Sequence, residues 1–231
     1  IRFAESVESP QQVGFSIGSI AGEEVDTFVL PSMLNAKNEK HASLAAGFVG
    51  GRYRQNSWSW VDATIAASWS KADIGRCLSL LPFTAETWQR AKTLLAEDAS
   101  EYWMKVGVNP YQAEGDLRIA IGKLIEHNRP WAAIFCLAKA IHDKHPLNKG
   151  LAVRALLAAV KSTEGYDTYN AIEIIKALQK DPEINEDELF KVEWAYLPLL
   201  DGHHSASPKC LETRLASDPR FFCELIRLIY R

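Results

Sequence analysis

The stretch IHDKHPLNKG, residues 141–150, places two histidines and an aspartate close together in the sequence. His142 and His145 are three residues apart, so on a helix they share a face and could ligate zinc. Zinc would need a third ligand nearby, and the sequence contains no HExxH pattern. The alternative is a helix end, where Lys144 and the histidines suit the negative end of the helix dipole before Pro146 stops the helix. We favour the helix end.

A second histidine pair, His203 and His204, lies in DGHHSASP, where glycine and serine indicate a solvated loop. No carboxylate or thiol is spaced to complete a metal site there. The nucleophile and phosphate-binding patterns GxSxG, GxxxxGK[ST], GxGxxG and SxxK are absent from the sequence. We therefore expect no catalytic residue, no metal and no cofactor, and a metal-dependent hydrolase is the weakest hypothesis for function.

The segment GFVGGRYR, residues 47–54, joins three glycines to two arginines, and aromatic residues crowd positions 53–69. Arginine beside aromatic rings can stack nucleobases or bind peptides, which makes Arg52, Arg54 and Trp58 candidate binding residues. The alternative is that the glycines allow a close approach by another helix and that the aromatic residues form a core. We favour this packing interpretation.

Proline-containing joints recur along the second half of the chain, at Asn109-Pro110, His145-Pro146, Asp181-Pro182 and Asp218-Pro219. The steps between these prolines are 36, 36 and 37 residues, and two helical patterns with a turn lie between successive joints. Proline suits the first turn of a helix, and Asn or Asp before it offers a capping oxygen. The pattern predicts three helical hairpins over residues 109–231, each needing its neighbours to cover an apolar face.

The remaining chain divides into an N-terminal segment and a helical layer. Residues 1–38, interrupted by glycine and proline, are predicted to be irregular with one or two short helices. Residues 39–108 are predicted to form a helical layer continuous with the hairpins, with Ser57, Ser70 and Thr84 placed to cap helices. The expected fold is therefore all-α: stacked helical hairpins with an irregular N-terminal lead.

The hairpin region, roughly residues 110–231, resembles divergent tetratricopeptide-like or HEAT-like repeats. The resemblance rests on small and aromatic packing residues, as in RPWAAIFCLAKAI, and on the proline after each second helix. The Trp-Leu-Gly-Tyr spacing of the tetratricopeptide consensus is absent. LAAGFVGGRYRQNSWSWVD and EWAYLPLLD also resemble the helical C-terminal region of large bacterial multidomain proteins, some of which carry NTPase modules and act in defence. These resemblances imply a non-catalytic fragment of a larger bacterial protein that scaffolds protein interactions.

In such an array the first helix of each hairpin lines the concave face. Candidate binding residues on these first helices are Arg118, Lys123, Arg154, Lys191 and Trp194. A solvated charged face is the commoner role of such residues. The last helical pattern, RFFCELIRLIY, carries an apolar stripe of Phe221, Phe222, Leu225 and Ile229. We expect another chain, a further repeat or the preceding hairpin to cover this stripe, and self-association is one such arrangement.

Composition and charge limit the classes of partner that we expect for the chain. The net charge of −3 gives no overall basic field for nucleic acid. No apolar run approaches the roughly 18 residues of a membrane span, so no membrane is expected. Four scattered cysteines without a CxxC pair are expected to be small buried side chains in a cytoplasmic protein. The expected partner is a protein, a peptide or another domain of the same polypeptide, and the rival hypothesis is a nucleic-acid-binding repeat that uses Arg52, Arg54 and the lysines of the first helices.

Overall fold

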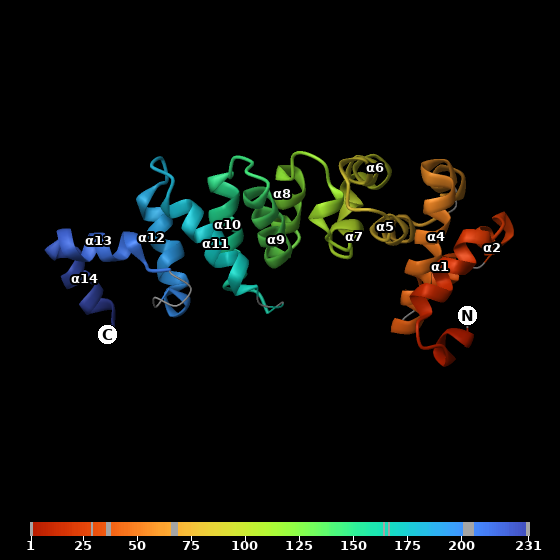
Figure 1. Ribbon diagram of the computed structural model, residues 1–231, viewed down its shortest axis with the longest axis horizontal. Coiled ribbons are helices and arrows are strands. Elements are labelled where there is room, and N and C mark those ends of the chain that lie inside the picture. The colour runs from red at the N-terminus through yellow and green to blue at the C-terminus, as the bar shows by residue number, and fades with distance from the viewer. Residues whose placement is uncertain are drawn as a thin grey trace. The chain divides into compact units, whose positions relative to one another are not determined.

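The structure, a computed structural model, describes residues 2–28, 30–35, 38–65, 69–163, 165, 167–200 and 206–229. Every regular element in these ranges is a helix, which confirms the predicted all-α class (Figure 1). The chain divides into two compact units, residues 1–114 and residues 115–231. None of the helices in the described ranges is both long enough and apolar enough to span a lipid bilayer.

The first unit contains η1 (Arg2–Ser6), α1 (Pro10–Ile20), α2 (Glu23–Phe28), α3 (Leu30–Leu34), α4 (Glu39–Thr64), α5 (Lys71–Ser79), α6 (Ala85–Leu95), η2 (Ala96–Ala99), α7 (Ser100–Trp103) and η3 (Pro110–Gln112). Three α-helices thus lie among the described residues of segment 1–38, where the sequence predicted mostly irregular chain. Two predicted caps are confirmed, because Ser70 Oγ accepts the backbone N–H of Asp73 at 3.1 Å and Thr84 Oγ1 accepts that of Thr87 at 3.4 Å.

Helices α1 and α4 pack through glycines that lie one turn apart on each helix: Gly14 and Gly18 on α1, Gly47 and Gly51 on α4. A Cβ atom at Gly47 would lie 1.9 Å from the carbonyl oxygen of Gln11, and one at Gly14 would lie 2.1 Å from that of Leu44. The two backbones therefore touch directly. This confirms the packing interpretation of GFVGGRYR and explains why α1 is helical, because close contact with α4 offsets the low helix propensity of its glycines.

Helix α4 is kinked at Ser57, where φ is 51° and ψ is −146°. The sequence predicted a helix start at Ser57, and the second of the two helical segments joined in α4 does begin after that residue. A positive φ is uncommon for a residue other than glycine, so the kink carries backbone strain. Beyond the kink, Trp60 and Val61 are buried again.

The second unit contains α8 (Arg118–Glu126), α9 (Pro130–His142), α10 (Lys149–Ala159), α11 (Thr168–Gln179), α12 (Glu186–Ala195), η4 (Leu197–Leu199), α13 (Lys209–Ser217) and α14 (Pro219–Ile229). Figure 1 shows these helices following one another along the unit. Helix α9 contacts α8, α10 and α11, while α12 contacts α10, α11 and α13. The pairs α8–α9, α10–α11 and α12–α13 fall where the sequence predicted hairpins.

Asparagine and aspartate side chains cap several of these elements. At the joints, Asn109, Asp181 and Asp218 each accept a backbone N–H two residues ahead, at 3.2, 2.8 and 2.9 Å, which confirms the predicted capping oxygens. Pro146 and Pro182 do not begin helices. Instead Asn148 caps α10 and Asn185 caps α12, because the Oδ1 atom of each accepts a backbone N–H at 3.0 Å.

The histidine-containing stretch closes α9, as the helix-end interpretation predicted. Lys144 has a φ of 60°, its N–H donates to Ile141 O at 3.0 Å, and the N–H of His145 donates to Ala140 O at 2.9 Å. This hydrogen-bond pattern is a Schellman C-cap. His142 and His145 are exposed, and the described residues hold no group of three or more His, Cys, Asp or Glu arranged for a metal. His203 and His204 lie outside the described residues.

The four cysteines are free. Cys77 and Cys136 are buried, and burial raises the pKa of each thiol to about 12. These two therefore behave as the small buried side chains expected from the sequence. Cys210 is half-buried and Cys223 is exposed, so the expectation is wrong for the last of them.

Candidate interaction surface

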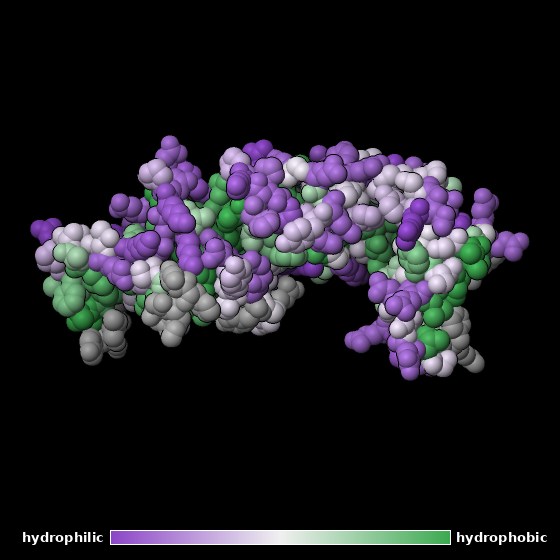
Figure 2. Space-filling view, in the orientation of Figure 1, coloured by the Kyte–Doolittle hydropathy of each residue, from purple (hydrophilic) through white to green (hydrophobic). Residues whose placement is uncertain are grey.

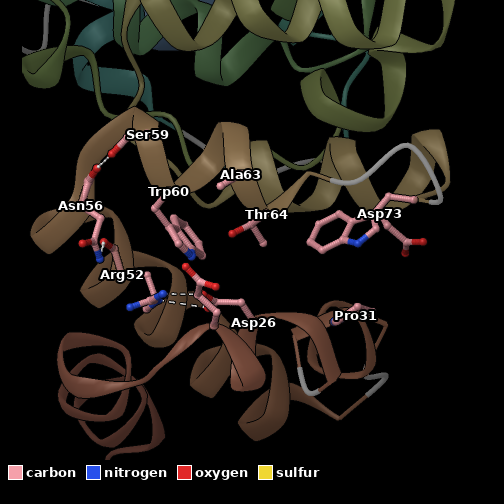
Figure 3. A pocket seen from close by; sticks show the side chains of 11 residues that line it. Asp26, Pro31, Arg52, Asn56, Ser59, Trp60, Ala63, Thr64 and Asp73 are labelled. Carbon is pink, nitrogen blue, oxygen red and sulfur yellow. Dashed lines mark hydrogen bonds and ion pairs between the residues drawn. The ribbon is translucent and has the colours of Figure 1, made fainter.

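Arg52, the first predicted binding residue, is held in a buried ion pair. Its Nε donates to Asp26 Oδ1 at 3.0 Å, its Nη2 contacts Asp26 Oδ2, and its Nη1 donates to the carbonyl oxygen of Ala21 at 2.6 Å (Figure 3). Arg52 is 8% exposed and Asp26 is 4% exposed. The guanidinium thus ties α4 to α2 and is not presented to the backbone of a nucleic acid.

Arg54 and Trp58 also pack within the first unit. The guanidinium carbon of Arg54 lies 5.7 Å from the centroid of the Phe15 ring on α1. Trp58 is half-buried, with the Tyr53 ring edge-on at 5.3 Å and the Arg90 guanidinium 4.2 Å from its centroid. Trp58 is thus partly packed, whereas Arg54 stays exposed beside Phe15.

The predicted cations of the first helices lie in a solvated charged face. Arg118 Nε donates to Asp116 Oδ2 at 2.7 Å, and this hydrogen bond holds the pKa of the Asp116 carboxyl below its usual value. Lys123 pairs with Glu126 at 2.7 Å. Arg154 and Lys191 are exposed. Because surface pairs of this kind are screened by water, they contribute little to the stability of the fold.

Aromatic side chains gather where α12, α13 and α14 meet. The ring centroid of Phe190 on α12 lies 5.3 Å from that of Phe221 on α14 and 6.1 Å from that of Trp194. Arg214 of α13 lies over both phenylalanines, 5.2 Å from Phe190 and 4.9 Å from Phe221. Its Nη1 also pairs with Asp187 Oδ1 at 3.0 Å. The guanidinium therefore joins all three helices.

Part of this aromatic cluster is open to solvent. Trp194 is 40% exposed, Phe222 is 51% exposed and Ile226 is 38% exposed. Phe222 and Ile226 are four residues apart, so they share one face of α14. Figure 2 shows hydrophobic side chains gathered over α14 at the end of the second unit. We call the residues Phe190, Trp194, Arg214, Phe221, Phe222 and Ile226 the α12–α14 surface.

The predicted apolar stripe is thus only partly covered. Phe221 contacts the preceding hairpin through Phe190, as expected, and Leu225 is half-buried. Phe222 remains half-exposed within this chain, so its cover by another chain or a further repeat stays a prediction. The side chain of Ile229 is not among those that the structure describes. Sequence analysis selected Trp194 but missed Phe190 and Arg214, although the i, i+4 spacing of Phe190 and Trp194 was a usable signal.

A buried carboxylate fixes the helices beneath this surface. Glu193 of α12 is 0% exposed, and its Oε1 and Oε2 accept the backbone N–H groups of Cys210 and Leu211 at 3.1 and 2.9 Å. Gln179 Nε2 donates to Glu193 Oε1 at 2.7 Å and to Ser207 O at 2.8 Å. A carboxylate at the first turn of α13 caps that helix and complements its dipole. Glu193 therefore links α11, α12 and α13 through hydrogen bonds.

The α12–α14 surface has to be interpreted from its own chemistry, because no family model, no curated protein and no solved structure matches the chain. It offers large aromatic and aliphatic side chains with an arginine between them. Aromatic residues and arginine are enriched at the centres of protein–protein interfaces.

Proposed function

We propose that the chain is a protein-interaction module whose second unit is a tetratricopeptide-like scaffold of stacked hairpins. The α12–α14 surface binds an amphipathic helix of a partner protein. The observation that carries the proposal is the exposure of Phe222 and Ile226 on one face of α14. An apolar face of this kind on a helix is a recognised docking site for another helix.

The arrangement of the second unit supports a repeat array. Helix pairs follow one another, and the caps Asn148 and Asn185 stand at equivalent places 37 residues apart. In a repeat array each pair contacts only its neighbours. The resemblance to helical regions of bacterial multidomain proteins makes the chain, in this proposal, the interaction arm of a larger cytoplasmic protein.

The charges around the exposed pair indicate the chemistry of the partner. Arg220 and Arg227 are exposed on α14 near Phe222 and Ile226, and Glu224 is the one acidic residue in the sequence of that helix. Electrostatic complementarity favours a partner helix with acidic residues beside its apolar face. Nucleic acid is less well supported as a partner, because Arg52 is buried and both Arg118 and Lys123 pair with carboxylates.

Site-specific photo-crosslinking tests this proposal. A photo-reactive residue at position 222 should crosslink to one defined protein in cells, whereas the same residue at the exposed position Thr213 on α13 should not. Ile226→Ser in the same background should abolish the crosslink, and Glu224→Ser on the same helix should leave it intact. Equal crosslinking from positions 222 and 213, or a crosslink indifferent to Ile226→Ser, would contradict the proposal.

A further inference from the structure

A pocket of about 640 Å³ lies beside the Arg52–Asp26 pair in the first unit. Its lining comes from α2, α3, α4, α5 and the segment between α4 and α5. Figure 3 shows Trp60 and Thr64 of α4 on one side of this space, with Asp26 and Pro31 opposite. This volume is in the range of pockets that hold small molecules.

The charged side chains of the lining are already engaged within the chain. Asp26 pairs with Arg52. Asp73 Oδ1 pairs with Arg76 Nη1 at 3.4 Å, and Glu23 is not free either. Arg52 is the one cation among the described lining residues, so the lining offers no free cation to a phosphate or a carboxylate. Because a charged group is costly to bury without a partner, the lining favours an uncharged ligand.

Two side chains of α4, those of Trp60 and Thr64, bring hydrogen-bond donors to this pocket. Trp60 is 5% exposed, and its Nε1 donor has no acceptor among the residues that the structure describes. Thr64 lies one turn further along the same face of α4, and within the described part of the chain its hydroxyl has no hydrogen-bond partner. Figure 3 shows the nitrogen edge of the Trp60 indole directed toward the space between Trp60 and Asp26. A buried N–H without an acceptor is unfavourable, so an acceptor oxygen from outside the chain would satisfy it.

The apolar part of the lining is suited to a flat ring. Trp69, Ala63 and Pro31 contribute an indole, a methyl group and a pyrrolidine ring. The guanidinium carbon of Arg52 lies 5.7 Å from the centroid of the Trp60 ring and occupies one face of that ring, so Trp60 offers its donor edge to the pocket. Aromatic rings pack favourably edge-to-face or offset-stacked against another ring. A planar ring against Trp69 therefore fits this lining.

We infer that this pocket binds an uncharged planar molecule that carries a carbonyl oxygen. The ring lies against Trp69, and the carbonyl oxygen accepts from Trp60 Nε1 and from the hydroxyl of Thr64. A free aromatic amide and a nucleoside share this chemistry. A phosphorylated nucleotide is disfavoured, because Asp26 and the carbonyl oxygen of Ala21 already hold the arginine of the pocket.

Proton–nitrogen NMR of the whole chain tests this inference, because each of the seven tryptophans gives one indole N–H signal. Nicotinamide is the probe for a free aromatic amide, and uridine is the probe for a nucleoside. The Trp60 signal, assigned by triple-resonance experiments, should move downfield as a carbonyl oxygen accepts its proton. Tighter binding of one probe identifies its class as the source of the ligand. A Trp60 signal that moves with neither probe would overturn the inference.

Three further probes separate the parts of the proposed ligand. Methylpyridine lacks the carbonyl oxygen of nicotinamide, and cyclohexanecarboxamide lacks its planar ring. Uridine monophosphate adds a charged group to uridine. Each should bind at least about fivefold more weakly than the probe to which it is matched. Methylpyridine or cyclohexanecarboxamide binding as tightly as nicotinamide would overturn the assigned contacts, and equal binding of uridine and its monophosphate would overturn the assigned neutrality of the ligand.

A matched pair of variants places the ligand in this pocket. Thr64→Val removes the hydroxyl but keeps the shape of the side chain, so it should weaken binding of the better probe roughly fivefold. Thr93→Val makes the same change at an exposed position of α6 outside the lining and should leave the affinity unchanged. Trp69→Leu should also weaken binding roughly fivefold, and the partial exposure of Trp69 makes this change compatible with folding. Unchanged affinity in either Thr64→Val or Trp69→Leu would overturn the assigned site.

Discussion

The two units bring their helices together in different ways. In the first unit α1 and α4 touch backbone to backbone at glycines, and the buried Arg52–Asp26 pair ties α4 to α2. In the second unit the helix contacts are made by buried alanine, leucine and isoleucine side chains, and a comparable pair, Arg214–Asp187, lies at the surface. The comparison indicates that the first unit depends on a few specific contacts, whereas the second spreads its contacts over many side chains and leaves Phe222 and Ile226 of α14 exposed.

The largest difference should appear when the two arginines are compared. Arg52→Met leaves Asp26 buried and unpaired, so we expect a loss of about 3–5 kcal/mol in the free energy of unfolding. Arg214→Met removes a partly exposed ion pair and two cation–π contacts, and should cost about 1–2 kcal/mol. Urea denaturation followed by circular dichroism measures both. Equal losses would show that the buried pair stabilises the protein no more than the surface pair does. The double variant Asp26→Leu with Arg52→Met should recover much of the stability that Arg52→Met loses.

The next largest difference in stability should appear when one helix glycine in each unit is replaced by alanine. Gly47→Ala places a Cβ atom against the Gln11 carbonyl oxygen and should destabilise the first unit by about 2–3 kcal/mol, because α1 must shift. Gly122→Ala on α8 meets nothing within 4 Å and should stabilise the second unit by up to about 1 kcal/mol. Melting curves of both variants check the sign. A stabilising Gly47→Ala would mean that α1 and α4 are not in direct contact.

The second unit also contains one buried charged group, the carboxylate of Glu193. Glu193→Gln replaces one acceptor oxygen by an amide donor facing a backbone N–H, so we expect a loss of about 2 kcal/mol and faster hydrogen exchange in α13. Glu188→Gln, exposed on the same helix, should change stability by less than about 0.5 kcal/mol. If both variants behave alike, α13 is positioned by packing alone.

The smallest effects should come from residues with positive φ. Ser57→Gly relieves strain at the kink of α4 and should stabilise the first unit by about 1 kcal/mol. Lys144→Gly at the C-cap of α9 should stabilise the second unit by less, since single residues adopt the left-handed helical region at modest cost. Differential scanning calorimetry measures both. A destabilising Ser57→Gly would mean that the Ser57 side chain contributes more than the strain removes.

Local signals in the sequence predicted much of the fold. The caps Ser70 and Thr84 and the end of α9 depend on residues within about one helical turn of each other, and the structure has them where the sequence placed them. The recurring prolines also predicted the positions of the helix pairs α8–α9, α10–α11 and α12–α13. The glycines at 47 and 51 correctly indicated a close helix contact. Their partners, Gly14 and Gly18, were instead interpreted as helix breakers, because propensity alone does not include the tertiary contact that offsets it.

Contacts between distant residues could not be predicted in the same way. Glu193 accepts from residues 17 and 18 positions later, and Arg52 pairs with Asp26, 26 positions earlier. Nothing in the local pattern distinguishes these charged side chains from the solvated ones around them. For the same reason the sequence did not predict the α12–α14 surface, since Arg214 on α13 contacts Phe190 on α12 and Phe221 on α14.

Hydrogen–deuterium exchange of the chain, alone and with the partner captured by crosslinking at position 222, tests the central claim most directly. A partner helix bound at the α12–α14 surface should slow exchange in α12 and α14 and leave α1 and α4 unchanged. Unchanged exchange in α12 and α14, or slowing confined to residues 1–114, would contradict the assignment of this surface as the site of interaction.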